Sequence, residues 1–199
     1  MTKTESPVTV VIVLLNAVIF FVTLTAGEAL VSIGVMDYDL VLGGQFYRFV
    51  TAMFLHGSID HLVGNMLLLF AMGEMVEKVC GSVKYAVIYF SAGILGNAAS
   101  LFYEMISGAR YSSLGASGAV YGILGALIVL ALKRVSGINI VRQRIPLALI
   151  YCLYSSFIMP NIDFAAHIGG FIAGVILTSL LVRGDNTDEE TGSGIYIYR

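Results

Sequence analysis

The sequence predicts an all-α membrane protein with six transmembrane helices and both termini in the cytoplasm. Of its 199 residues, 58% are hydrophobic and only 12% are charged, whereas about a quarter of the residues in an average soluble protein are charged. The charged residues are grouped, so that long uncharged runs separate them. The 11 basic and 13 acidic residues give a net charge of −2, which excludes the basic surplus that a nucleic-acid-binding protein needs.

Each uncharged run is long enough for a helix that crosses roughly 30 Å of hydrocarbon. These runs predict spans at about 7–26, 85–105, 114–132, 145–158 and 164–182. A sixth span, at about 58–80, is less apolar because Glu74 and Glu77 lie near its end, where we expect them to form an interfacial ion cluster with Lys78. We therefore expect one membrane-embedded domain over 1–183, with a longer connection at roughly 27–57, and a polar acidic cytoplasmic tail over 184–199.

The distribution of Lys and Arg predicts the orientation of these spans. With a cytoplasmic N-terminus, only Arg48 and Arg110 lie on the outer side, and nine basic residues lie on the inner side. These nine are Lys3, Lys78, Lys84, Lys133, Arg134, Arg142, Arg144, Arg183 and Arg199. Because cytoplasmic loops carry an excess of basic residues, both termini are predicted to be cytoplasmic. The spans at 58–80, 114–132 and 164–182 then all begin at the outer face.

Polar residues inside a membrane span are costly, so those at the outer ends of these three spans need a reason. His61 and Asn65 share one face of the first of them, Ser117 follows Gly115-Ala116 in the second, and His167 lies near the start of the third. Each of the two histidines and Ser117 is expected about three residues past the start of its helix, at one common depth. A hydroxyl, two imidazoles and an amide near helix N-termini are typical of a nucleophile, a base and oxyanion donors.

Small residues predict that two of these spans pack closely. Gly170 and Gly174 follow His167 at i+3 and i+7, and Gly118 and Gly122 form a similar stripe behind Ser117. Such stripes let helix backbones approach each other in membranes. If the two faces meet, Ser117 and His167 come within hydrogen-bonding reach, which is the geometry that a general base needs.

Other interpretations of the same residues stay open. The chain could be a small polytopic transporter or a metal or proton channel, since intramembrane His often serves in ion pathways. It would use His56, His61 and His167 together with Glu74 and Glu77 of the second span. It could also be an inactive relative that binds substrates without cutting them. Asp163 lies one turn before His167 at the outer mouth, and we interpret it as a charge at the start of the helix rather than as a third catalytic residue.

Three segments resemble, in order and spacing, the rhomboid family of intramembrane serine proteases. They are Phe54-Leu55-His56 through His61-Leu62-Val63-Gly64-Asn65, then Gly115-Ala116-Ser117-Gly118, then Ala166-His167-Ile168-Gly169-Gly170 with Gly174. Tyr47-Arg48 is similar to an aromatic-Arg pair of that family. The resemblance covers nearly the whole chain and implies a rhomboid-like bundle of the prokaryotic six-helix type.

The resemblance also implies roles for residues of this sequence. Ser117 would be the nucleophile and His167 the general base and later acid, with an oxyanion hole made by Asn65, His61 and the backbone N–H of Ser117. Tyr121 would pack on His167, while Gly115, Ala116, Gly118, Gly170 and Gly174 would support the site. No cofactor or metal is implied, and the span at 145–158 with the loop at 159–163 would act as gate and lid.

Partners and location follow from the same resemblance. Transmembrane proteins would be the substrates, cut in or near their membrane segments, and the lipid bilayer is the other partner. The chain is expected as a multi-pass protein of the cell (plasma or inner) membrane, with a site that opens to the extracytoplasmic side. Neither the particular substrates nor the oligomeric state follows from the sequence.

Overall fold

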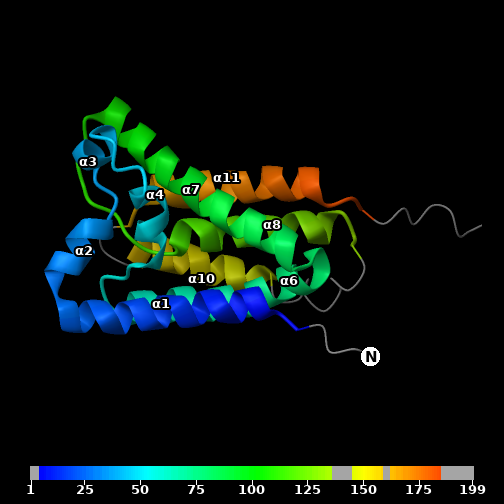
Figure 1. The fold of residues 1–199 in the computed structure, drawn as a ribbon. Helices are drawn as coiled ribbons and strands as arrows, with labels where there is room; N and C mark the ends of the chain where they lie inside the picture. Colours follow the sequence, from blue (N-terminus) through cyan, green and yellow to red (C-terminus); the bar gives the residue numbers. More distant parts are fainter. Residues whose placement is uncertain (1–4, 136–144, 159–161, 185–199) are drawn as a thin grey trace, which may run out of the picture.

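In the computed structural model, which describes residues 5–135, 145–158 and 162–184, the chain forms a bundle of helices (Figure 1). The predicted tail beyond Gly184, Arg142, Arg144 and most of the predicted lid lie outside these residues. The long helices are α1 (Pro7–Ala26), α7 (Ser82–Ser107), α8 (Ser117–Leu132), α10 (Ile145–Ile158) and α11 (Phe164–Leu181). A further continuous helical stretch consists of α5 (Ile59–Leu68), the π-helical turn η2 (Leu69–Gly73) and α6 (Glu74–Cys80).

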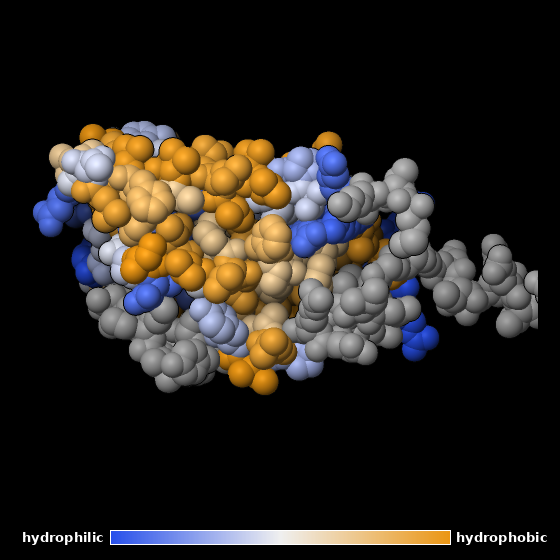
Figure 2. Space-filling view, turned by 90° about the horizontal axis from the view of Figure 1, so that it is seen from below, coloured by the Kyte–Doolittle hydropathy of each residue, from blue (hydrophilic) through white to orange (hydrophobic). Residues whose placement is uncertain are grey.

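These helical stretches begin and end within three residues of the predicted spans. Four of them are long and apolar enough to cross a membrane: Pro7–Ala26, Ile59–Cys80, Ser82–Ser107 and Phe164–Leu181. At 1.5 Å per residue, α8 with 16 residues is about 24 Å long and α10 with 14 residues about 21 Å. Figure 2 shows apolar side chains over the middle of one face of the bundle and polar ones gathered mostly toward its ends. The chain is a helical membrane protein.

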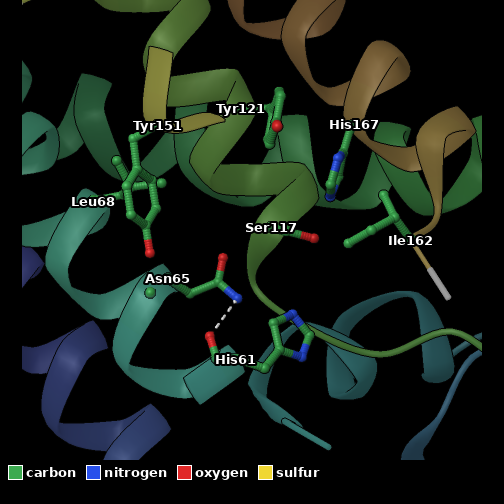
Figure 3. Close-up of a pocket in the computed structure, with 9 residues that line it drawn as sticks. His61, Asn65, Leu68, Ser117, Tyr121, Tyr151, Ile162 and His167 are labelled. Carbon is green, nitrogen blue, oxygen red and sulfur yellow. Dashed lines mark hydrogen bonds between the residues drawn. The ribbon is translucent and has the colours of Figure 1, made fainter. Parts of the chain in front are cut away.

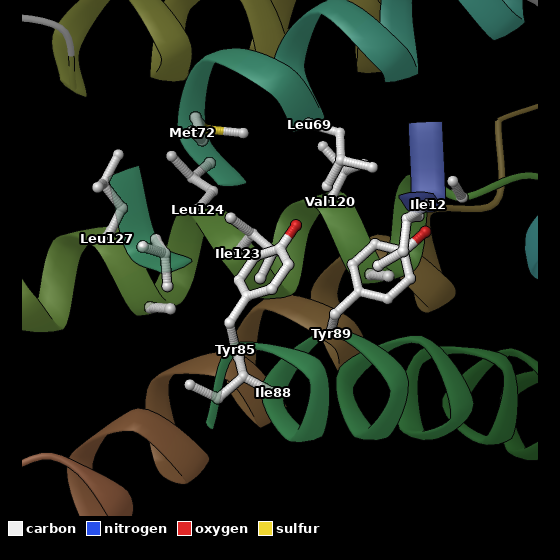
Figure 4. Close-up of a cluster of buried hydrophobic side chains, with 14 of the residues drawn as sticks. Ile12, Leu69, Met72, Tyr85, Ile88, Tyr89, Val120, Ile123, Leu124 and Leu127 are labelled. Atoms are coloured by element: carbon white, nitrogen blue, oxygen red, sulfur yellow. The ribbon is translucent and has the colours of Figure 1, made fainter. Parts of the chain in front are cut away.

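The centre of the bundle is α8, most of whose residues are buried. Its apolar side chains pack with Leu69 and Met72 of η2 and with Tyr85, Ile88 and Tyr89 of α7 (Figure 4). On the other side, α11 packs against both α7 and α8. A helix buried on all sides explains why α8 is apolar around its whole circumference.

The predicted packing of the glycine stripes is confirmed. A Cβ atom on Gly170 would overlap the carbonyl oxygen of Gly118, and one on Gly174 would overlap that of Gly122. On the α7 side, a Cβ on Gly96 would lie 2.7 Å from the carbonyl oxygen of Ala166. Backbone therefore touches backbone along α11, and any larger residue at these positions would push the helices apart.

The predicted connection at 27–57 contains short helices that the sequence analysis did not anticipate: α2 (Glu28–Gly34), α3 (Tyr38–Leu42), α4 (Arg48–Thr51) and the 3₁₀ turn η1 (Ala52–Phe54). Arg48 is buried, and its guanidinium donates to the carbonyls of Ser32 (2.9 Å) and Val35 (2.6 Å). Ala52 then accepts a bond from the Gly115 N–H (2.9 Å), which attaches this connection to the start of α8.

The expected interfacial ion cluster is only partly correct. Glu74 does pair with Lys78, but Glu77 turns inward and is 1% exposed. Its carboxylate accepts from the N–H of Val8 (3.0 Å), the N–H (2.8 Å) and hydroxyl (2.7 Å) of Thr9, and the hydroxyl of Ser82 (2.7 Å). The first N–H groups of α1 have no partner within their own helix, and Glu77 satisfies two of them.

Candidate active site

A small cavity lies at the end of the bundle where α5, α8 and α11 begin (Figure 3). Its volume of about 30 Å³ leaves room for roughly two water molecules. Four of the residues selected from the sequence line it together, and they come from three helices: His61, Asn65, Ser117 and His167. The remaining lining residues are Gly64, Leu68, Tyr121, Tyr151 and Ile162.

Ser117 is the first residue of α8, so the predicted helix start at 114 is wrong by three residues. Gly115 has φ of +133°, which a helix cannot accommodate, and Ala116 occupies the cap position without a side-chain cap bond. Only glycine suits Gly115, because a Cβ there would also lie 2.9 Å from Nε2 of His61. This turn brings the His61 ring against the residues that lead into Ser117, which is itself half-buried.

The imidazole of His167 lies in the first turn of α11 and is 5% exposed. Tyr121 stacks on it with a centroid distance of 4.1 Å and an interplanar angle of 13°, so the predicted packing of these two rings is confirmed. The Tyr121 hydroxyl donates to the carbonyl of Cys152 on α10 (2.6 Å). In Figure 3 the edge of the His167 ring points toward Ser117. Tyr121 therefore holds the ring plane and is itself held by α10.

Asn65 and His61 face Ser117 from α5. The Asn65 amide is 6% exposed and donates from Nδ2 to the backbone carbonyl of His61 (3.1 Å). Ser58 caps the helix by accepting from the N–H of His61 (3.2 Å). These bonds fix the first turn of α5, so that the amide and the His61 ring lie on either side of the same part of the cavity (Figure 3).

His56 supports His61 from outside the helix. The two rings meet edge to face at 5.0 Å, and His56 is 4% exposed. Burial, followed by the proximity of His61, lowers the pKa of His56 to about 3. His56 is therefore a neutral packing partner at physiological pH.

Tyr151 on α10 and Gly64 on α5 were not selected from the sequence. The Tyr151 hydroxyl lies where a Cβ on Gly64 would be 2.9 Å away, so the tyrosine closes the side of the cavity between α5 and α10. The one available signal was a glycine between His61 and Asn65 on a helix face that otherwise carries chemistry. Its partner on α10 could not be identified without the fold.

The arrangement places the Ser117 hydroxyl, two imidazoles and the Asn65 amide around a space with room for water. Such a set is suited to acyl transfer, which needs a nucleophile, a base and oxyanion donors close together. Within residues 5–135, 145–158 and 162–184, no three His, Cys, Asp or Glu side chains are grouped as a metal ion would require. The supporting glycines Gly118, Gly170 and Gly174 lie between helices rather than in the cavity.

Comparison with known proteins identifies the family of the chain. The Rhomboid domain profile matches residues 43–184, a range that includes all residues of the cavity. The chain is 37% identical to Rhomboid protease GluP of Bacillus subtilis over 158 residues (79% of this chain, 30% of that protein). It is 30% identical to Putative rhomboid protease YdcA of the same species over 151 residues (75% and 74%) and 32% identical to RHOMBOID-like protein 5 of Arabidopsis thaliana over 156 residues (76% and 49%).

The chain thus spans less than a third of GluP, about half of RHOMBOID-like protein 5 and about three quarters of YdcA. The profile match covers well over half of the chain, and the similarity to YdcA extends over most of both proteins. The three motifs identified in the sequence lie inside the matched range. The protein is a member of the rhomboid family.

Proposed function

We propose that this protein is an intramembrane serine endopeptidase that hydrolyses peptide bonds in or near transmembrane segments of other membrane proteins. The observation that carries the proposal is the convergence of Ser117, His167, His61 and Asn65 on one small cavity, with Tyr121 stacked on His167. Family membership supports it, because GluP and YdcA are named as rhomboid proteases.

In the proposed reaction Ser117 and His167 act as a dyad. The His167 imidazole takes the proton of the Ser117 hydroxyl as the serine Oγ attacks the scissile carbonyl. The imidazole later gives that proton to the leaving amine. Water then repeats the sequence on the acyl-enzyme and releases the second product. Stacking on Tyr121 limits rotation of the imidazole, so less orientational freedom is lost when the transition state forms.

The oxyanion would be stabilised by Asn65, His61 and the backbone N–H of Ser117. Because α8 begins at Ser117, this N–H is among those that have no acceptor within the helix. The positive end of the α8 dipole points at the same place, which favours the negative charge of the tetrahedral intermediate. Asn65 already gives one N–H to the His61 carbonyl, which leaves its second amide hydrogen for the oxyanion.

We infer a topology with six spans that includes the shorter helices α8 and α10. Most residues of α8 are buried among neighbouring helices, so its length need not match the full hydrocarbon thickness. In Figure 1, α1 begins and α11 ends at the same end of the bundle, and the cavity lies toward the other end. With the basic residues inside, both termini would be cytoplasmic, and the cavity would open on the extracytoplasmic side of the cell membrane. The membrane domain would extend over 1–183 and the tail over 184–199.

The interpretation as a transporter or channel gains no specific support from the site. His56 packs against His61, whereas His167 packs against Tyr121 in a separate stack. An inactive relative would have the same fold and would differ only in turnover. Turnover is therefore the property to measure.

The proposal is tested by cleavage of a single-span reporter protein with the full chain in proteoliposomes. Parent protein should cut the reporter, and Ser117→Ala should abolish cutting, while Ser91→Ala, a matched change in α7, should cut like the parent. Equal cleavage by the parent and Ser117→Ala would overturn the proposal. It would also be overturned if the parent cuts none of the reporters that related rhomboid proteases cut.

A further inference from the structure

A second polar cluster lies beside the cavity and joins three segments of the chain. Asp163, the residue before α11, accepts through Oδ2 from the hydroxyl of Ser100 on α7 (2.5 Å). Its other oxygen accepts from the N–H of Ala166 (2.9 Å) and from the hydroxyl of Tyr111 (3.5 Å). The Ser100 and Tyr111 hydroxyls are themselves 3.3 Å apart. Tyr111 belongs to the segment that leads from α7 to Ser117.

This cluster does more than cap a helix. A helix cap needs only one oxygen that accepts from an N–H of the first turn. Asp37 provides such a cap for α3, where its Oδ1 accepts from the N–H of Leu40 (3.0 Å). Asp163 uses its second oxygen for Ser100, which is 1% exposed. A hydroxyl buried to that extent needs a partner, so the Ser100–Asp163 bond is a fixed point of the packing.

Tyr111 is suited to remain the donor in this cluster. It lies outside the spans, in the connection between α7 and α8. Burial is the main cause that raises the pKa of its hydroxyl, and the carboxylates of Asp163 and Glu104 raise it further. The phenol therefore stays protonated and can donate to Asp163. The Tyr111 N–H in turn points to the Glu104 carboxylate (3.4 Å), which anchors the segment to the end of α7.

The contact surfaces of α11 explain why such a fixed point matters. Along its faces toward α7 and α8, Gly170 and Gly174 lie directly against backbone carbonyls, and Gly169 lies against the Cβ of Ala99. Smooth surfaces allow close approach but resist sliding along the helix axis poorly. Directional hydrogen bonds supply that resistance at both ends of α11. Asp163 makes them at its start, and Lys133 Nζ donates to the carbonyls of Ser179 (2.7 Å) and Val182 (2.5 Å) at its end. The Asp163 carbonyl also accepts from the N–H of His167 (3.2 Å), so the anchored residue and the imidazole belong to one turn.

We propose that Asp163, together with Ser100 and Tyr111, is a positioning group that sets the place of His167 relative to Ser117. The inference rests on the proposed dyad. It assigns Asp163 an indirect role: its carboxylate fixes the first turn of α11 against α7 and against the segment entering α8. In reactions that depend on alignment, a displacement of about 1 Å costs on the order of a hundredfold in rate.

The primary test is Ser100→Ala in the full chain, because it leaves the Asp163 cap intact and removes only the anchor. We expect kcat for the reporter protein to fall roughly tenfold to a hundredfold, with KM within about twofold of the parent value. Asp163→Asn, which retains a capping oxygen, should act in the same direction. The double variant should be no slower than the slower single variant, because both substitutions act on the same Ser100–Asp163 hydrogen bond. Ser91→Ala and Asp37→Asn are the matched controls and should keep parental kcat.

Labelling of Ser117 by a fluorophosphonate separates positioning from general damage to the fold. If the cluster acts through His167, adding Ser100→Ala to the parent protein slows labelling. Adding Ser100→Ala to the His167→Ala variant leaves its slow residual labelling unchanged. A kcat per folded molecule equal to that of the parent, or equal slowing in both backgrounds, would overturn the inference while leaving the protease function intact. If Ser100→Ala and Asp163→Asn do not fold, Tyr111→Phe decides: kcat should fall several-fold, and an unchanged kcat rejects the inference. A parent that neither cuts nor labels rejects the proposed function, and the inference with it.

Discussion

Two groups of buried polar residues lie at opposite ends of the bundle, and they differ in what surrounds their polar atoms. At the end where α1 begins, Glu77 accepts four hydrogen bonds from Val8, Thr9 and Ser82. At the end where α5, α8 and α11 begin, Ser117, His167, Asn65 and His61 surround a space of about 30 Å³. A buried group saturated by fixed donors stabilises the fold, whereas polar groups around a space with room for water are available for chemistry.

The largest difference between the two groups is expected from His167→Asn, which should affect cleavage and not stability. Loss of the general base should lower the cleavage rate by roughly 10²- to 10⁴-fold. The thermal unfolding temperature should change little, because the asparagine still fits the space beside Tyr121. Initial rates on the reporter protein, measured together with a melting curve, check both parts. A cleavage rate within threefold of the parent's would contradict the assigned role.

Glu77→Ala should show the opposite pattern. It leaves two N–H groups and two hydroxyls without their acceptor, and each unsatisfied buried group costs about 1–3 kcal/mol, so the loss of stability should be several kcal/mol. The cleavage rate per folded molecule should stay parental. Glu74→Ala, which removes a more exposed ion pair with Lys78, is the control and should cost under about 1 kcal/mol. Similar melting temperatures for the two variants would refute the structural role of Glu77.

The next effect concerns His56, whose pKa is lowered to about 3 in the folded protein. The unfolded chain has a His pKa near 6.5, so between these two values the unfolded state binds the extra proton and stability falls as pH falls. At pH 5 this loss amounts to about 2 kcal/mol. His56→Phe should therefore lose less stability than the parent between pH 7 and pH 5, as measured by denaturation at both values. Parallel pH profiles of the two proteins would show that His56 is not the group responsible.

A smaller effect is expected at the side of the cavity. Tyr151→Ala removes the ring that lies against Gly64 between α5 and α10. If this ring restricts entry, the variant should cut the reporter several-fold faster at low substrate concentration. Tyr103→Phe, at an exposed position of α7, is a control for handling of the protein. A slower Tyr151→Ala variant would mean that the ring helps to bind the substrate rather than to exclude it.

The extent to which the sequence predicted this structure differs between the parts of the molecule. The long helices were predictable because uncharged runs of membrane-spanning length have few other stable arrangements. Ser117, His167, His61 and Asn65 were predictable because polar groups inside apolar helices are costly and therefore conspicuous. The helices between Glu28 and Phe54 were missed, since each has at most seven residues and too few turns for a periodic pattern.

The remaining errors arise from contacts between segments far apart in the chain. Glu77 looked like an interfacial charge because its donors on α1 are 68 and 69 residues away. The start of α8 was placed at 114 because an apolar run does not reveal a left-handed glycine such as Gly115. Asp163 was correctly interpreted as a charge at the helix start, but its bond to Ser100, 63 residues away, becomes visible only in the fold.

The central claim is that the polar cluster around the cavity is a reactive site, and labelling by a fluorophosphonate probe tests it most directly. The full chain in detergent is treated with the probe, and the modified residue is identified by mass spectrometry of its peptides. The account predicts a covalent adduct on Ser117 that forms far more slowly in His167→Asn and is lost in Ser117→Ala. An adduct of equal yield in Ser117→Ala and the parent, or a parent that cuts the reporter with its Ser117 unlabelled, would contradict it.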